Sequence, residues 1–256
     1  MSVVIDGILW IGGAALFGAV GVLLGRRLTH HHVKEGHNDV LVPVFLTAGV
    51  IYAVLLAFIV IAEWEFYDGA KANVAQEASQ LPPLYDIANV IGDEKAKELR
   101  HGLREYAESV IHGWDDFTHG RRDPKTSTPI VETFKTIAAL KPATKADELL
   151  AAQFLTSFNQ VLLARNKRYM HASESLSWLM WFGSIGGGVI VVGLAFFIYM
   201  DKTWPHVLVV SVMSGMIGML FFMIALLSEP FKGPLALHPE PFESSVNVFD
   251  IIDKDK

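Results

Sequence analysis

The chain has 256 residues, of which 52% are hydrophobic and none is cysteine. A formal net charge of −6 argues against nucleic acid as a partner, because phosphate backbones select basic surfaces. Without cysteine the chain can form no disulfide, thiolate nucleophile or cysteine metal site.

Four long apolar runs decide the class of protein, and they occupy residues 3–25, 40–62, 178–200 and 207–227. Each is just longer than the roughly 20 residues that a helix needs to cross the hydrocarbon of a bilayer. Lipid offers backbone amides no partner, so each run should be an α-helix, and an even number of crossings puts both termini and the middle segment on one side. We therefore predict an all-α, multi-pass integral membrane protein whose first partner is the lipid bilayer.

The first helix pair, residues 1–62, encloses a polar loop at residues 26–39 that is rich in histidine. Consecutive imidazoles in a short loop cannot all converge on one ion, so we predict no metal site and no cofactor. The weak candidate ligands are His30, His32 and His37. His37, Asn38 and Asp39 directly precede the second membrane helix, where an Asn or Asp side chain can cap the first turn.

Small residues recur at a spacing of four in the membrane helices, and such faces let backbones approach closely in lipid. They are Gly21 and Gly25 in the first, Gly49, Ala53 and Ala57 in the second, and Gly183 and Gly187 in the third. We expect these faces to pack against other helices or neighbouring subunits.

Three acidic residues, Glu63, Glu65 and Asp68, follow the second apolar run where its helix leaves the bilayer. If subunits assemble around an axis lined by this helix, each position becomes a ring of carboxylates that attracts cations. In a monomer the same side chains would only hydrate a helix end.

The middle segment, residues 63–177, has the apolar periodicity of a helical bundle. The second membrane helix should continue into it as far as the step formed by Pro82 and Pro83, which kinks or breaks a helix. Asp93 can cap the next helix, which should end near Gly113 or Gly120.

Two further helix starts are visible in the bundle. Thr128 followed by Pro129 is typical of a first turn, and Thr144 with Asp147 resembles a capping box that opens a long helix. We expect the first of these helices to turn four apolar side chains inward: Val131, Phe134, Ile137 and Leu140.

The second membrane pair, residues 178–228, is followed by a Pro-containing acidic tail at residues 229–256. Its composition predicts an extended or partly disordered segment. The chain contains no G-x-S-x-G, no phosphate loop ending in Lys-Ser or Lys-Thr, and no H-E-x-x-H, so we predict that it is not an enzyme.

Several short motifs resemble a bacterial membrane family of unknown function that is called bestrophin-like. They are residues 36–40 (GHNDV), residues 50–58 (VIYAVLLAF), Trp64 with Glu65, Glu77, Leu84 with Tyr85, and the closing motif at residues 229–233 (EPFKG). The resemblance covers most of the chain. It implies the layout of bestrophins, which are pentameric ion channels with two pairs of membrane helices, and it places the protein in a bacterial inner (plasma) membrane.

In bestrophins the second membrane helix lines the pore and narrows it with large apolar residues. By that resemblance the candidate pore-lining residues here are Leu55, Phe58, Ile59 and Ala62. The first hypothesis is therefore a homo-oligomeric channel, a pentamer by resemblance, for inorganic ions, with an acidic mouth that favours cations over chloride. The alternative is a non-conducting membrane scaffold or sensor whose helical bundle docks a partner.

Overall fold

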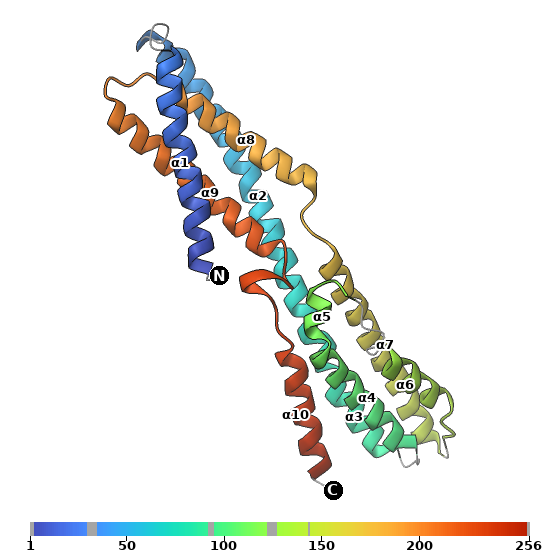
Figure 1. Ribbon diagram of the computed structural model, residues 1–256. Coiled ribbons are helices and arrows are strands. Elements are labelled where there is room, and N and C mark those ends of the chain that lie inside the picture. The colour runs from blue at the N-terminus through green and yellow to red at the C-terminus, as the bar shows by residue number, and fades with distance from the viewer. Residues whose placement is uncertain (1–2, 30–34, 92–94, 122–126, 143, 255–256) are drawn as a thin grey trace. The chain divides into compact units, whose positions relative to one another are not determined.

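All regular structure in the described residues is helical, which confirms the predicted all-α class. The computed structural model describes residues 3–29, 35–91, 95–121, 127–142 and 144–254. The long apolar helices are α1 (Val3–Thr29), α2 (Asn38–Ser79), α8 (Trp178–Phe196) and α9 (Thr203–Leu227) (Figure 1). The other elements are η1 (Glu35–His37), α3 (Leu81–Val90), α4 (Lys95–His112), α5 (Trp114–Thr118), α6 (Thr128–Ala138), α7 (Lys145–Ser173), η3 (Gly233–Leu235) and α10 (Glu240–Lys254).

The chain divides into two compact units. Unit 1 comprises Met1–Phe66 and Leu176–Ser228, and unit 2 comprises Tyr67–Ser175 and Glu229–Lys256. Helices α1, α2, α8 and α9 are the four that are long and apolar enough to cross a membrane. The protein is therefore an integral, multi-pass membrane protein, as the apolar runs predicted.

In unit 1, α2 packs on α8 through a tyrosine ring that lies over two glycines. A Cβ built on Gly187 would lie 2.6 Å from Cδ2 of Tyr52, and one built on Gly188 would lie 2.8 Å from the Tyr52 hydroxyl oxygen. That hydroxyl donates a hydrogen bond of 2.9 Å to the carbonyl of Ser184. The predicted packing role of Gly187 is confirmed, whereas a Cβ on Gly183 would meet nothing within 4 Å among the described residues.

Helix α1 lies along α9, and small residues again permit the approach (Figure 1). Gly18 faces the side chain of Ser214, and Gly218 faces Ala14 and the backbone of Trp10. Gly21 and Gly25, the small pair expected to pack, both face Phe196 at the end of α8. In lipid such close contacts replace the hydrophobic effect as the source of helix association.

Unit 2 packs α3, α4, α5, α7, α10 and the last turns of α2 around one apolar core. The predicted break at Pro82 and Pro83 is confirmed, because α2 ends at Ser79 and α3 begins at Leu81. The capping box of Thr144 and Asp147 is present in full at the start of α7. Asp93 lies outside the described residues.

Helix α6 begins at Thr128 as predicted, but only two of its four predicted inward side chains face the core. Val131 and Phe134 are 49% and 50% exposed, and Thr133 is buried in their place. Thr133 packs over Gly102 of α4, where only a residue without a Cβ leaves room for its hydroxyl. The small contact pair thus selects the face that α6 turns to the bundle, while Ile137 and Leu140 still pack against the core as expected.

The acidic tail is not extended, because residues 240–254 form α10. Phe242 and Phe249 of this helix are fully buried, and the ring of Phe249 stacks on Tyr85 with centroids 4.3 Å apart. The Ser245 hydroxyl donates a hydrogen bond of 2.9 Å to the carbonyl of Ala78. The prolines lie before α10 or in its first turn, where they do not interrupt helical hydrogen bonds.

The two glycines of α8 give a matched test of the Tyr52 contact. We expect Gly187→Ala to lower the free energy of unfolding by about 1–3 kcal/mol, because the new methyl group overpacks the tyrosine ring. Gly183→Ala, one turn earlier, meets open space and should be neutral or slightly stabilising. Thermal unfolding in detergent checks both, and equal effects of the two substitutions would contradict the packing described here.

Candidate functional site

The candidate pore residues lie on two different faces of α2. Leu55, Phe58 and Ala62 are exposed, with Phe58 at 68%, and their spacing of three and four places them on one side of the helix. We call this side the outer face. Ile59 is buried with Tyr52 in the apolar cluster of unit 1, so it lies on the inner face.

The acidic residues are divided in the same way. Glu65 is exposed and continues the outer face, because it lies three residues after Ala62 and seven after Phe58. Asp68, one turn further on, is also exposed. Glu63 is only 8% exposed and follows Ile59 on the inner face. A ring built from the outer face would thus expose Glu65 rather than Glu63.

The loop motif before α2 clamps a second loop. The amide of Asn38 donates to the carbonyl of Tyr199 at 2.9 Å and accepts from the backbone N–H of Tyr199, also at 2.9 Å. Both halves of the Asn38 amide therefore bind the α8–α9 connection, and a cap on the first turn of α2 by Asp39 stays a prediction. His30 and His32 lie outside the described residues, and the described residues contain no cluster of three possible metal ligands.

Unit 2 contains a fully buried ion pair that joins α2 to α7. Nε and Nη2 of Arg168 donate to the two carboxylate oxygens of Glu77 at 2.8 and 3.1 Å. The hydroxyl of Tyr106, on α4, donates to the same carboxylate. Such a bidentate pair with an added donor satisfies the charges that burial would otherwise leave unsolvated.

Four aromatic rings surround the guanidinium of Arg168. Its Cζ lies 4.6 Å from the ring centroid of Phe117, 5.1 Å from Tyr169, 5.6 Å from Trp114 and 5.8 Å from Phe242. Burial alone would lower the pKa of Arg168, but the charge and hydrogen bonds of Glu77 outweigh it and raise that pKa. Burial and the neighbouring carboxylate raise the pKa of Tyr106 well above its usual value, so the phenol stays protonated as a donor.

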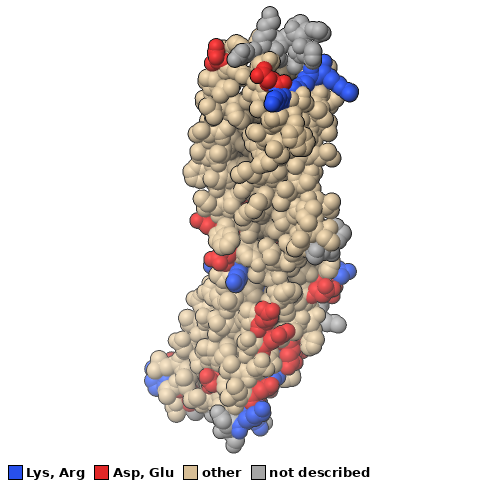
Figure 2. Space-filling view, turned by 90° about the vertical axis from the view of Figure 1, so that its left-hand side faces the viewer, with Lys and Arg blue, Asp and Glu red and all other residues tan. Residues whose placement is uncertain are grey.

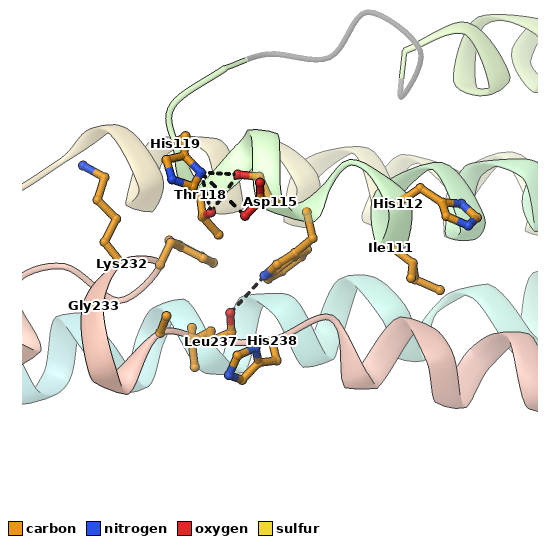
Figure 3. Close-up of a pocket in the computed structure, with 12 residues that line it drawn as sticks. Ile111, His112, Asp115, Thr118, His119, Lys232, Gly233, Leu237 and His238 are labelled. Carbon is orange, nitrogen blue, oxygen red and sulfur yellow. Dashed lines mark hydrogen bonds and ion pairs between the residues drawn. The ribbon is translucent and has the colours of Figure 1, made fainter. Parts of the chain in front are cut away.

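The closing motif at residues 229–233 forms one wall of an open cavity in unit 2. The cavity has a volume of about 700 Å³ and lies between α5 and the segment that leads to α10 (Figure 3). Phe231 anchors this wall, because its ring packs against Phe117 at 5.0 Å between centroids and against Trp114 at 6.1 Å. Trp114 also donates a hydrogen bond of 2.9 Å from Nε1 to the carbonyl of Leu237.

Polar side chains line the same cavity without converging on one point. Figure 3 shows His119 beside Asp115 and Thr118, with His112 and His238 away from this group. Nδ1 of His119 lies 2.7 Å from the Asp115 carbonyl and 3.7 Å from its carboxylate. Lys232, on the closing motif, also lines the cavity. These side chains form a polar rim around an aromatic wall, and they are not arranged as the ligands of a metal ion.

Comparison with known proteins decides the family. A family model described as a bestrophin-like domain matches residues 12–242. The chain belongs to the bestrophin-like family. A search of curated protein sequences finds no match.

Solved structures share the fold of this bestrophin-like protein. A bacterial bestrophin homologue from Klebsiella pneumoniae aligns with a TM-score of 0.75 at 12% identity, covering 95% of this chain and 98% of that chain. A mutant of a bestrophin homologue from the same organism gives a TM-score of 0.76 at 12% identity, with 95% and 98% covered. A crystal structure of a membrane protein gives 0.74 at 12% identity, with 95% and 97% covered. At this identity the likeness shows the fold alone.

Sequence reasoning missed the buried pair of the bestrophin-like protein. Glu77 was predicted only as part of the family motifs, and no partner was predicted for it. A signal was present in the sequence, since Arg168 lies seven residues after Val161 on the stripe of α7 that also buries Phe154 and Phe158. A charge on an apolar stripe indicates a buried partner.

Breaking this pair should strongly destabilise the bestrophin-like protein. We expect Arg168→Met to cost about 3–5 kcal/mol, because the Glu77 carboxylate is left buried without its partner. At this chain length such a loss lowers Tm by about 10 °C. A double variant with Glu77→Leu should recover most of the loss.

Thermal unfolding in detergent measures these effects. Lys135→Met is the matched control, because it removes a cation from the exposed pair with Glu132 and should change stability by less than about 0.5 kcal/mol. An Arg168→Met variant as stable as this control would show that the buried pair does not hold unit 2 together.

Proposed function

We propose that this bestrophin-like protein is a homo-oligomeric ion channel of the inner membrane, in which α2 lines the pore and an acidic mouth favours cations. A pore on the outer face of α2 requires several copies around an axis, because this face is open in a single chain. A pentamer is the ring that the resemblance to bestrophins implies. The bilayer and inorganic ions are then the partners of the protein.

One observation carries this proposal: the outer face of α2 joins large apolar side chains to the carboxylate of Glu65 on one side of the helix. Leu55 and Phe58 are exposed within the membrane segment, and Glu65 and Asp68 are exposed just beyond it. Repeated around an axis, Leu55 and Phe58 would form a hydrophobic constriction, and Glu65 would form a ring of negative charge. A constriction with a charged entrance is the arrangement by which channels gate and select ions.

The scaffold alternative is supported by the open cavity beside the closing motif. A partner with an apolar anchor and a polar rim of its own would suit its aromatic wall and its Lys232 and His119 edge. The two proposals differ in a simple measurement, because a scaffold gives no ion flux in liposomes.

Neutralising the mouth should change selectivity. We expect Glu65→Gln to reduce the cation-to-anion permeability ratio several-fold, since each subunit would lose one charge from the ring. Reversal potentials of the protein reconstituted in bilayers under a KCl gradient measure the ratio. Glu132→Gln neutralises a carboxylate of α6 that is also exposed and should leave the ratio unchanged. The same reversal potential in both variants would overturn the acidic-mouth proposal.

Widening the proposed hydrophobic constriction should raise the conductance of the channel. We expect Phe58→Ala to increase single-channel current or liposome flux several-fold, because it removes the most exposed ring from the outer face of α2. Phe182→Ala is a fair control, as Phe182 of α8 has a similar exposure, 69%, but does not lie on α2. Absence of ion flux in the parent protein and in every variant would contradict the channel proposal and favour the scaffold proposal.

A further inference from the structure

A second cavity lies within unit 1, at the C-terminal end of α1. Its volume is about 490 Å³ and it opens to the surface. Five of its lining residues belong to α1 and the sixth begins α9: Val20, Leu23, Leu24, Arg26, Arg27 and Thr203. Neither the pore proposal nor the family motifs account for it.

The lining is divided into an apolar part and a cationic part along α1. Val20, Leu23 and Leu24 are exposed and belong to the membrane-spanning stretch. Arg26 and Arg27 lie in the last turn of the helix. From Val20 to Arg27 the helix rises by about 10 Å, which is enough to pass from the acyl chains into the headgroup layer of a bilayer.

The two arginines are held differently. Arg26 donates to the carbonyl of Met200 and to the hydroxyl of Thr203, so its guanidinium is fixed at the edge of the cavity by the α8–α9 connection. Arg27 is exposed on the same turn. The cavity therefore presents one cation of fixed position and one that can adjust to a ligand.

The surroundings of the cavity have the composition of a membrane interface. Trp204, next to Thr203, is 73% exposed, as expected of an indole at the headgroup level. Figure 2 shows Lys and Arg side chains together with Asp and Glu side chains at this end of unit 1, next to a broad surface without charged side chains. Lys202 and Asp201 are exposed nearby but do not line the cavity.

We propose that this cavity binds an anionic phospholipid. Its phosphate would contact Arg27 and the edge of Arg26, and an acyl chain would lie on Val20, Leu23 and Leu24. A soluble anion would use only the guanidinium groups and leave the apolar half of the lining in water. A zwitterionic headgroup would bring its own cation toward two arginines, which costs binding energy.

Native mass spectrometry of the full chain in detergent tests the site, with phosphatidylglycerol titrated against phosphatidylcholine of the same acyl chains. We expect phosphatidylglycerol to bind more tightly, and Arg27→Gln to weaken it about fivefold, the effect of one basic residue at a membrane surface. Lys202→Gln removes the same charge at the same end of unit 1 outside the cavity and should have no effect. Arg27→Lys should restore most of the binding.

The apolar half is tested separately. Leu23→Trp fills the cavity and should weaken phosphatidylglycerol binding, whereas Leu9→Trp puts the same ring on an exposed part of α1 and should not. Equal losses in Arg27→Gln and Lys202→Gln would show general surface attraction and overturn the site. Displacement by millimolar inorganic phosphate, with Leu23→Trp silent, would show a soluble-anion site and also overturn it. Because lipid binding is read directly, neither result depends on ion flux.

Discussion

The contact between Tyr52 and the glycine pair of α8 fixes the rotation of α2 about its own axis within unit 1. The ring occupies the space where side chains at Gly187 and Gly188 would lie, and the hydroxyl is held by the Ser184 carbonyl. In lipid there is little hydrophobic force between helices, so close packing and one buried hydrogen bond carry most of the specificity. Once Tyr52 is set, the spacing of the helix decides that Ile59 and Glu63 are inside and that Phe58 and Glu65 are outside.

Unit 2 holds its own stretch of α2 by a different force. Glu77 is fully buried and its two oxygens receive Arg168 and Tyr106, so the helix cannot turn without leaving a charge unpaired. Such pairs add little net stability compared with apolar residues, but any alternative arrangement is costly. The cage around Arg168 includes Phe242 of α10, so the C-terminal helix helps to exclude water from the pair.

Features that depend on a few neighbouring residues could be predicted from the sequence. The membrane helices follow from apolar length, the break after Ser79 from two prolines, and the start of α7 from Thr144 and Asp147. The position of Arg168 on the apolar stripe of α7 indicates that it has a buried partner, but the partner, Glu77, lies 91 residues away, and no local pattern indicates which residue it is. The burial of Glu63 and the exposure of Glu65 could not be predicted either. Both faces of α2 are apolar in sequence, and only the position of α8 distinguishes them.

The acidic tail, residues 229–256, is a second case in which distant contacts decide a structure that local composition does not predict. Phe242, Val246 and Phe249 have helical spacing, but acidic and proline-rich composition argued for an extended segment. What decides the outcome is an apolar surface elsewhere on the chain: Tyr85 of α3 stacks on Phe249, and Arg104 of α4 pairs with Asp250 and Asp253. The acidity that suggested disorder is therefore the complement of a basic side chain on α4, and α10 forms because that side chain and the aromatic core are both present.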